Sequence, residues 1–135
     1  MKIHIGKYND RKPRKVSVKI KAWDTYSMDE TLALIIHPML VQLTDYCSRH
    51  RGCAMVDDED VPIHLRGEGQ ELYYPRWEYV LGEMVWAFGE HLSGTGESIF
   101  FDAAGELDEV GLRAYAERKT TGFCLFGKYY QGLWT

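Results

Sequence analysis

Residues 76–92 read RWEYVLGEMVWAFGEHL and predict an α-helix. Large apolar residues recur there at helical spacing and form one stripe, which consists of Trp77, Val80, Leu81, Met84 and Phe88. Three further apolar residues fall outside the stripe, namely Tyr79, Val85 and Trp86. The predicted helix is therefore apolar around more of its circumference than a simple surface helix.

A second helical pattern precedes this one. Ser27 followed by Glu30 fits a capping box, and Asp29 adds negative charge near the positive end of the helix dipole. An apolar stripe follows at helical spacing and contains Leu32, Ile35, Ile36, Met39, Leu40, Leu43 and Cys47. Pro38 lies inside the pattern and removes a backbone donor, so we expect a kink or a break there. Gly52 predicts the end of the helix.

The N-terminal region predicts a β-hairpin. Residues 2–8 and 15–23 have the pattern of two strands, and the polar residues 9–14 suit the loop between them. In the second strand Val16, Val18 and Ile20 alternate with lysine and serine, which is typical of a half-buried strand. We expect its apolar face to be buried and its basic face to be exposed.

The rest of the chain completes an α+β pattern. Residues 53–75 predict an irregular connector, Ser98–Asp102 a short strand, and Leu107–Thr120 a third helix. Glycines leave the aromatic segment 122–134 open to either helix or strand. Two Gly-X-Gly stretches, 67–69 and 94–96, fit turns better than phosphate loops. The sequence predicts a single domain over residues 1–135, with a small antiparallel sheet packed by about three helices.

Bulk composition is that of an ordinary soluble protein. The chain has 135 residues, 45% of them hydrophobic and 27% charged. No apolar run approaches the roughly 20 residues that cross a bilayer, and the N-terminus lacks a secretory signal pattern. We therefore expect no membrane partner. Three cysteines in a chain of this size favour a reducing compartment.

Charge is distributed unevenly along the chain. The net charge of −4 argues against general nucleic-acid binding. Basic residues nevertheless gather near the N-terminus, at Lys7, Arg11, Lys12, Arg14, Lys15, Lys19 and Lys21, and leave the remainder strongly acidic. This asymmetry either orients a partner or a neighbouring subunit, or reflects a solvated strand face and hairpin loop.

Four consecutive carboxylates, Asp57, Asp58, Glu59 and Asp60, form an acidic run in the connector. Such close like charges must be solvated, paired with basic groups, or occupied by a cation such as Mg²⁺ or Mn²⁺. Their spacing does not match an EF-hand loop. Pairing is the favoured interpretation, and the nearby arginines that suit it are Arg49, Arg51, Arg66 and Arg76.

A zinc site is a weaker hypothesis. Cys47, His50, Cys53 and His64 supply ligand types that suit tetrahedral zinc. Their spacing lacks the usual paired knuckles, and Cys47 also fits the core stripe of its helix. We therefore expect no cofactor, with Mg²⁺ or Mn²⁺ at the acidic run as the alternative.

Aromatic residues concentrate in two segments, around 73–88 and 123–134. They suit a core, a subunit interface, or a platform on which a base stacks beside cations that hold phosphates. The candidate ligand-binding residues for the last interpretation are Arg76, Trp77, Arg118, Lys128, Tyr129 and Tyr130.

Several stretches resemble a group of small, functionally uncharacterised proteins of tailed bacteriophages. They are WDTYSMD (23–29), VDDEDVP (56–62), Arg76-Trp77 with Glu83-Met84, and FGKYYQGLW (126–134). The hairpin and residues 93–112 lie outside the resemblance. It implies a viral origin and action in the bacterial cytoplasm, in agreement with the cysteine content, and it assigns no activity or site.

Together these features predict a non-enzymatic phage binding protein that forms a homo-oligomer. Its target would be a host protein, as for an inhibitor of host defence, or a nucleotide-like signal that it sequesters. One alternative is a metal-dependent phosphohydrolase or nuclease that uses the acidic run. Another is a component of the virion or of its assembly.

Overall fold

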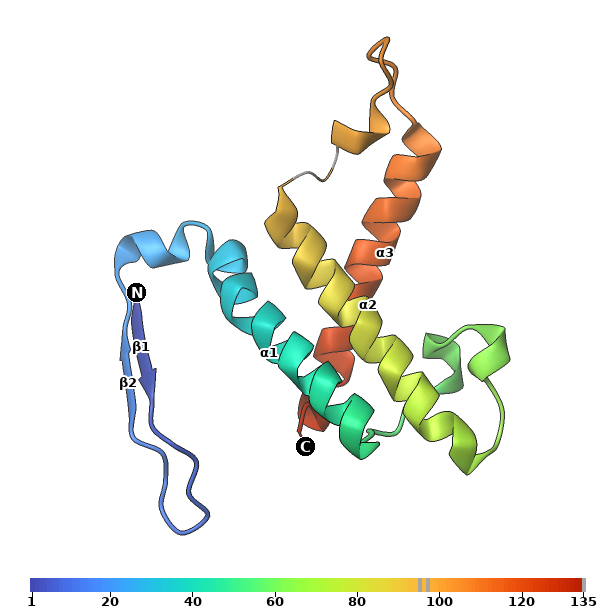
Figure 1. The fold of residues 1–135 in the computed structure, drawn as a ribbon. Coiled ribbons are helices and arrows are strands. Elements are labelled where there is room, and N and C mark those ends of the chain that lie inside the picture. Colours follow the sequence, from blue (N-terminus) through green and yellow to red (C-terminus); the bar gives the residue numbers. More distant parts are fainter. Residues whose placement is uncertain (95, 97, 135) are drawn as a thin grey trace. The chain divides into compact units, whose positions relative to one another are not determined.

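The computed structural model describes residues 1–94, 96 and 98–134, and it contains a two-stranded antiparallel sheet and three α-helices (Figure 1). The predicted α+β class with a small antiparallel sheet is confirmed. The chain forms two compact units, Met1–Leu32 and Ala33–Thr135. The prediction of a single domain over 1–135 stays a prediction.

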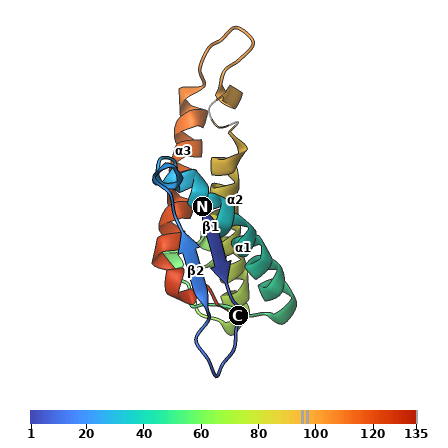
Figure 2. The ribbon, with the colours of Figure 1, turned by 90° about the vertical axis from the view of Figure 1, so that its left-hand side faces the viewer.

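The first unit is the predicted hairpin. Strand β1 (Lys2–Ile5) pairs with β2 (Val16–Lys19) (Figure 2). In the register of this pair, Ile3 lies opposite Val18. Because cross-strand partners share a face, the apolar residues Ile3, Ile5, Val16 and Val18 lie on one face and the polar residues on the other. Every strand residue is exposed, so the expected burial of the apolar face is wrong here. The reason is that β2 pairs only with β1, and this unit contains no second layer to cover them.

Asp24 closes the base of the hairpin. The N-terminal ammonium donates to its Oδ1 over 2.7 Å, and the backbone N–H of Lys21 donates to its Oδ2 over 2.7 Å. These bonds, with the one from the N-terminal ammonium foremost, lower the pKa of the Asp24 carboxyl. A short 3-10 turn, Ala22–Thr25, follows and leads to the first helix.

Helix α1 (Met28–His50) begins directly after Ser27, as predicted, and Pro38 lies inside it without ending it. Its buried residues are Ala33, Leu40 and Cys47. The predicted stripe is only partly buried, because Leu32 and Met39 are exposed. The helix ends at His50, and the next residue, Arg51, has a φ of 56° in the left-handed region.

Helices α2 (Tyr73–Ser93) and α3 (Glu109–Lys128) form the centre of the second unit (Figure 1). The predicted α2 stripe is buried as expected. The helix starts three residues before the predicted Arg76, because Pro75 is tolerated in a first turn whose N–H groups have no helical partner. Asp108 caps α3 by accepting from the N–H of Gly111.

The aromatic C-terminal segment is helical. Helix α3 extends past the predicted end at Thr120 to Lys128, and a 3-10 turn, Tyr130–Gly132, follows. Gly122 allows α3 to approach α2 closely. A Cβ atom at this position would overlap the Cβ of Ala87 and lie 2.6 Å from the carbonyl oxygen of Glu83. The glycine that obscures the helical pattern is thus a packing requirement of the helix pair.

The predicted strand Ser98–Asp102 is wrong. Ser98–Phe100 form a 3-10 turn, and only a single bridge joins Phe101 to Leu107. The Asp102 side chain accepts from the N–H groups of Ala104 and Glu106, and this turn competes with a longer strand. Of the expected turn 94–96, Gly94 has the left-handed φ of 65°, while Thr95 lies outside the described residues.

Among the described residues, no helix combines the length and apolarity that crossing a membrane requires.

Candidate functional site

The acidic run lies in a connector built from short turns. Asp58–Asp60 and Ile63–Leu65 form 3-10 turns between α1 and α2. Val56 and Val61, which flank the run, are both buried in the core. These two apolar anchors hold the carboxylates at the surface of the second unit, next to the end of α3.

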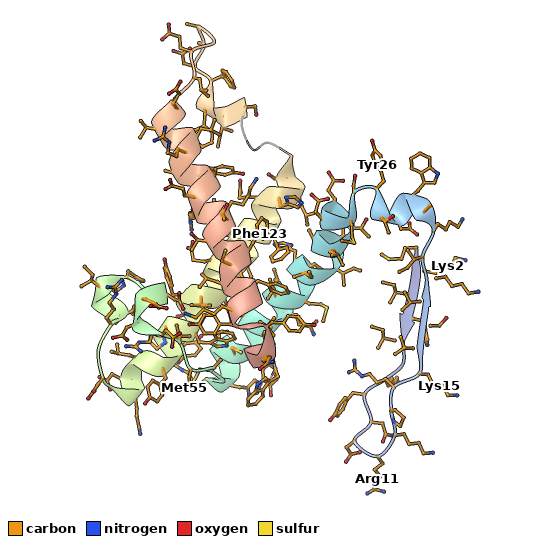
Figure 3. The ribbon with its side chains drawn as sticks, turned by 180° about the vertical axis from the view of Figure 1, so that it is seen from behind. Lys2, Arg11, Lys15, Tyr26, Met55 and Phe123 are labelled. Carbon is orange, nitrogen blue, oxygen red and sulfur yellow. The ribbon has the colours of Figure 1, made fainter. Side chains whose placement is uncertain are left out.

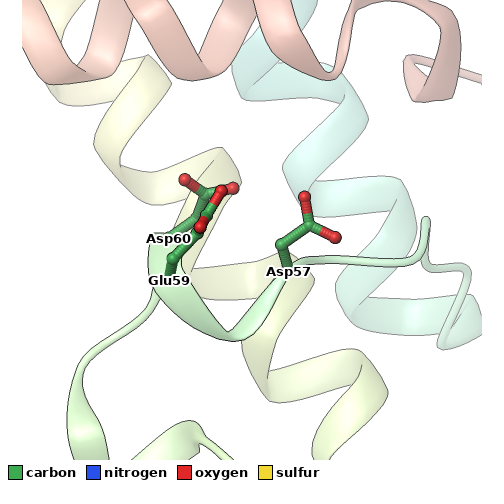
Figure 4. Close-up of side chains that lie close together, drawn as sticks. All are labelled: Asp57, Glu59 and Asp60. Carbon is green, nitrogen blue, oxygen red and sulfur yellow. The ribbon is translucent and has the colours of Figure 1, made fainter.

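Three carboxylates of the run converge on one ammonium group. Lys128 Nζ lies 2.8 Å from Asp57 Oδ2, 3.1 Å from Glu59 Oε1 and 2.6 Å from Asp60 Oδ2. Figure 4 shows the three carboxylates on their connector below α3. Hydrogen bonds from Lys128 to these carboxylates, to Asp57 foremost, raise the pKa of Lys128. The predicted pairing with basic groups is confirmed, although Lys128 was not among the arginines expected to provide it.

Tyr129, which carries no charge itself, adds two hydrogen bonds to the same cluster. Its hydroxyl accepts from the N–H of Asp57 over 3.0 Å and donates to Asp60 Oδ2. Its ring lies edge-on to Trp77, with centroids 6.0 Å apart. Burial and the hydrogen bond to Asp60 raise the pKa of Tyr129 to about 12. The residue thereby joins the hydrophobic core to the charged surface cluster.

Arg76 holds the fourth carboxylate and the connector backbone. Its side chain is only 7% exposed, and it pairs with Asp58. Its guanidinium also donates to three backbone carbonyls from separate parts of the connector, those of Val56, Leu65 and Gly67. The N–H of Gly67 in turn donates to Asp58 over 3.1 Å. Arg76, one of the predicted partners, therefore holds several parts of the connector together through one buried side chain.

The other three arginines that sequence offered as partners are engaged elsewhere. Arg49 pairs with Asp45 one helical turn away. Arg66 donates to the carbonyl of Val61, and Arg51 lies over the ring of Tyr74.

The geometry of the cluster decides what it can do chemically. Ligand oxygens of Asp57, Glu59 and Asp60 lie within 4.8 Å of one another, which would suit a divalent cation. Lys128 Nζ already lies within ion-pair distance of all three. A cation must therefore displace the ammonium group before it can bind, and the cluster with Lys128 in place is a structural ion-pair network.

We expect wild-type protein not to bind Mg²⁺ or Mn²⁺ at millimolar concentration, because Lys128 competes for the same three carboxylates. Substitution Lys128→Met removes the ammonium and should create measurable affinity for either ion. Isothermal titration calorimetry of both proteins tests this. Millimolar binding by the wild type that is lost in Asp57→Asn would contradict the expectation and favour a metal site.

The hypothetical zinc ligands do not come together among the described residues. Cys47 is buried in the core, and this burial raises the pKa of its thiol. Cys53 is exposed, and His50 stacks on Tyr46 within α1.

The predicted ligand-binding residues fall into three places. Arg76, Trp77, Lys128 and Tyr129 lie together around the acidic run and are engaged with it or buried. Arg118 lies on α3 and forms an ion pair with Glu83 that contains two hydrogen bonds. Its Cζ atom lies 4.0 Å from the centroid of the Trp86 ring. Tyr130 is exposed beyond the end of α3. The six residues do not form one surface.

Comparison with protein-family models, with curated proteins and with solved structures gave no match to this chain.

Proposed function

We propose that this protein is a non-enzymatic bacteriophage protein that works in the bacterial cytoplasm by binding a protein partner through α1. The resemblance of the four stretches to phage proteins supports the origin. The surface of α1 supports the mode of action. The partner is a host protein, as for an inhibitor of host defence, and the same surface suits self-association.

The observation that carries this proposal is the absence of charge on most of α1. Residues 31–44 contain no Asp, Glu, Lys or Arg. Of the apolar side chains there, Leu34 and Met39 are each 65% exposed and Val41 is 44% exposed. A helix that is apolar around most of its circumference is normally covered on more than one side. Contiguous exposed apolar surface of this kind is typical of protein-interaction sites.

The engaged state of the charged groups also supports binding over catalysis. The acidic run is neutralised by Lys128 and Arg76, so its carboxylates are not free to act as a general base. The same pairing disfavours a nucleotide-like ligand at Arg76, Trp77, Lys128 and Tyr129, because phosphate groups would have to displace the carboxylates. A protein partner on α1 requires no such rearrangement.

We expect the double substitution Leu34→Glu/Val41→Glu to weaken association at least about tenfold, because each glutamate would bring an unpaired charge into an apolar interface. The matched control is Val110→Glu on α3, at an apolar residue that is 81% exposed and lies outside α1. Light scattering measures self-association, and native mass spectrometry of tagged protein from infected cells measures host partners. A strict monomer at high concentration, with the same co-purifying proteins for wild type and the double variant, would overturn the proposal.

A metal-dependent phosphohydrolase is the second candidate, and the convergence of Asp57, Glu59 and Asp60 is the observation in its favour. It requires Lys128 to leave the cluster. The cation titration described above separates the two candidates, since only this one needs wild-type protein to bind the metal.

A further inference from the structure

We propose that the basic face of the hairpin binds the phosphate backbone of nucleic acid. This surface consists of Lys2, Lys15 and Lys19, together with the loop cations Lys7, Arg11, Lys12 and Arg14. It lies wholly in the first unit and is independent of α1. The proposal replaces the expectation that this protein does not bind nucleic acid. That expectation used the net charge of −4, which is the sum of a basic hairpin and an acidic remainder.

Within the described part of the chain, the cations of this surface have no carboxylate partners. All seven residues are exposed, and none of them forms an ion pair with a carboxylate among the described residues. Asp10 is the only acidic residue among the first 21. Arg14 instead lies over the ring of Tyr8, at 5.3 Å. Figure 3 shows Lys2 and Lys15 along the hairpin and Arg11 at the tip of its loop. The charges are therefore available to an anionic partner.

The register of the hairpin brings like charges together. Lys2 lies directly opposite Lys19, and two like charges in that position destabilise a strand pair. The ladder continues past Ile5–Val16, where the N–H of Gly6 donates to the carbonyl of Lys15 over 2.8 Å. Alternation therefore places Lys15 on the same face as Lys2 and Lys19. An anion that bridges the Lys2–Lys19 pair would remove the repulsion between them.

The shape and charge of the hairpin suit a nucleic-acid backbone. Lys15 and Lys19 are four residues apart on one face of an extended strand, about 13 Å, so their ammonium groups can contact different phosphates. A two-stranded ribbon is also narrow enough to enter a major groove. Duplex DNA presents a continuous row of negative charge to such a ribbon, and we therefore take nucleic acid as the occupant.

The test is fluorescence anisotropy with a labelled DNA duplex of mixed sequence and with a single strand, each measured over a series of salt concentrations. We expect non-specific binding with a dissociation constant of about 10⁻⁶–10⁻⁴ M near physiological salt. For the duplex, affinity should fall with salt at a logarithmic slope of about −0.9 for each phosphate contact. Lys15→Gln/Lys19→Gln should reduce the magnitude of that slope by about 2.

The matched control is Arg113→Gln/Lys119→Gln, which removes the same charge from α3. It should leave the slope unchanged, and circular dichroism verifies the fold of both double variants. Three results would overturn the proposal: no binding to either nucleic acid at low salt, an equal loss of slope in both double variants, or equally tight binding to polyglutamate. The last result would assign the face to an acidic protein partner.

Discussion

Substitution Arg76→Ala should lower the free energy of unfolding by about 3–5 kcal/mol, because it removes a buried guanidinium that donates to three carbonyls of the connector and leaves them without their donor. The guanidinium is the common donor to the carbonyls of Val56, Leu65 and Gly67. Its removal leaves these acceptors and Asp58 without their partner. A domain of this size has only about 5–15 kcal/mol of stability in total. The midpoint of urea unfolding measures the effect.

Two further variants sharpen the result for Arg76. Arg76→Lys keeps the charge but lacks the planar fork that reaches several acceptors at once, so it should restore only part of the lost stability. Arg118→Ala is the control, since the Arg118 side chain is itself half-exposed, and its loss should cost only about 1 kcal/mol. Equal losses for Arg76→Ala and Arg118→Ala would refute the organising role of Arg76.

Substitution Gly122→Ala should destabilise the protein by about 1–3 kcal/mol, although alanine is normally the better helix former. The added methyl would overlap the side chain of Ala87 and press on the carbonyl oxygen of Glu83, so α2 and α3 must move apart. Gly82→Ala is the matched control, because a Cβ atom there has open space around it. That control should stabilise the protein by about 1 kcal/mol. Thermal or urea unfolding should therefore show a loss of stability for Gly122→Ala and a gain of stability for Gly82→Ala.

A second substitution distinguishes between the two contacts that the methyl group of Gly122→Ala would make. In the Gly122→Ala background, Ala87→Gly removes one of the overlapping groups, but the carbonyl oxygen of Glu83 is backbone and stays. We therefore expect a favourable coupling of about 0.5 kcal/mol or more between the two substitutions, with incomplete recovery of stability. Stabilisation by Gly122→Ala alone would show that the helices are less tightly packed than described.

The elements with a strong local pattern are those that sequence predicted well. The apolar stripe of α2 and the start of α1 directly after Ser27 depend on residues within or next to the helix itself, and both are found as expected. Helix α3 was predicted too short because Gly122 breaks the pattern, and the reason for that glycine lies on another helix. Exposure of Val16 and Val18 was missed because alternation shows that a strand has two different faces, but not that anything covers one of them.

The candidate site was predicted only in part for a similar reason. Pairing of the acidic run followed from like-charge repulsion, and Arg76 was one of four arginines close enough in sequence to be considered. Lys128 lies 69 residues from Glu59, and Tyr129 lies 69 residues from Asp60, and no local rule joins such distant positions. Their only signal was the resemblance, which singled out 56–62 and 126–134 without indicating that the two segments meet.

The cluster around Lys128 also has a consequence for the order in which the protein folds. The Lys128–Glu59 and Tyr129–Asp60 contacts each close a chain segment of 69 residues, whereas the Glu83–Arg118 pair between α2 and α3 closes one of 35. Once α2 and α3 have docked, only the short stretch between Asp60 and the start of α2 remains to be ordered. Chain entropy thus favours docking of the helices first and closure of the acidic run afterwards. The four carboxylates then act late in folding, when their repulsion can no longer prevent the core from forming.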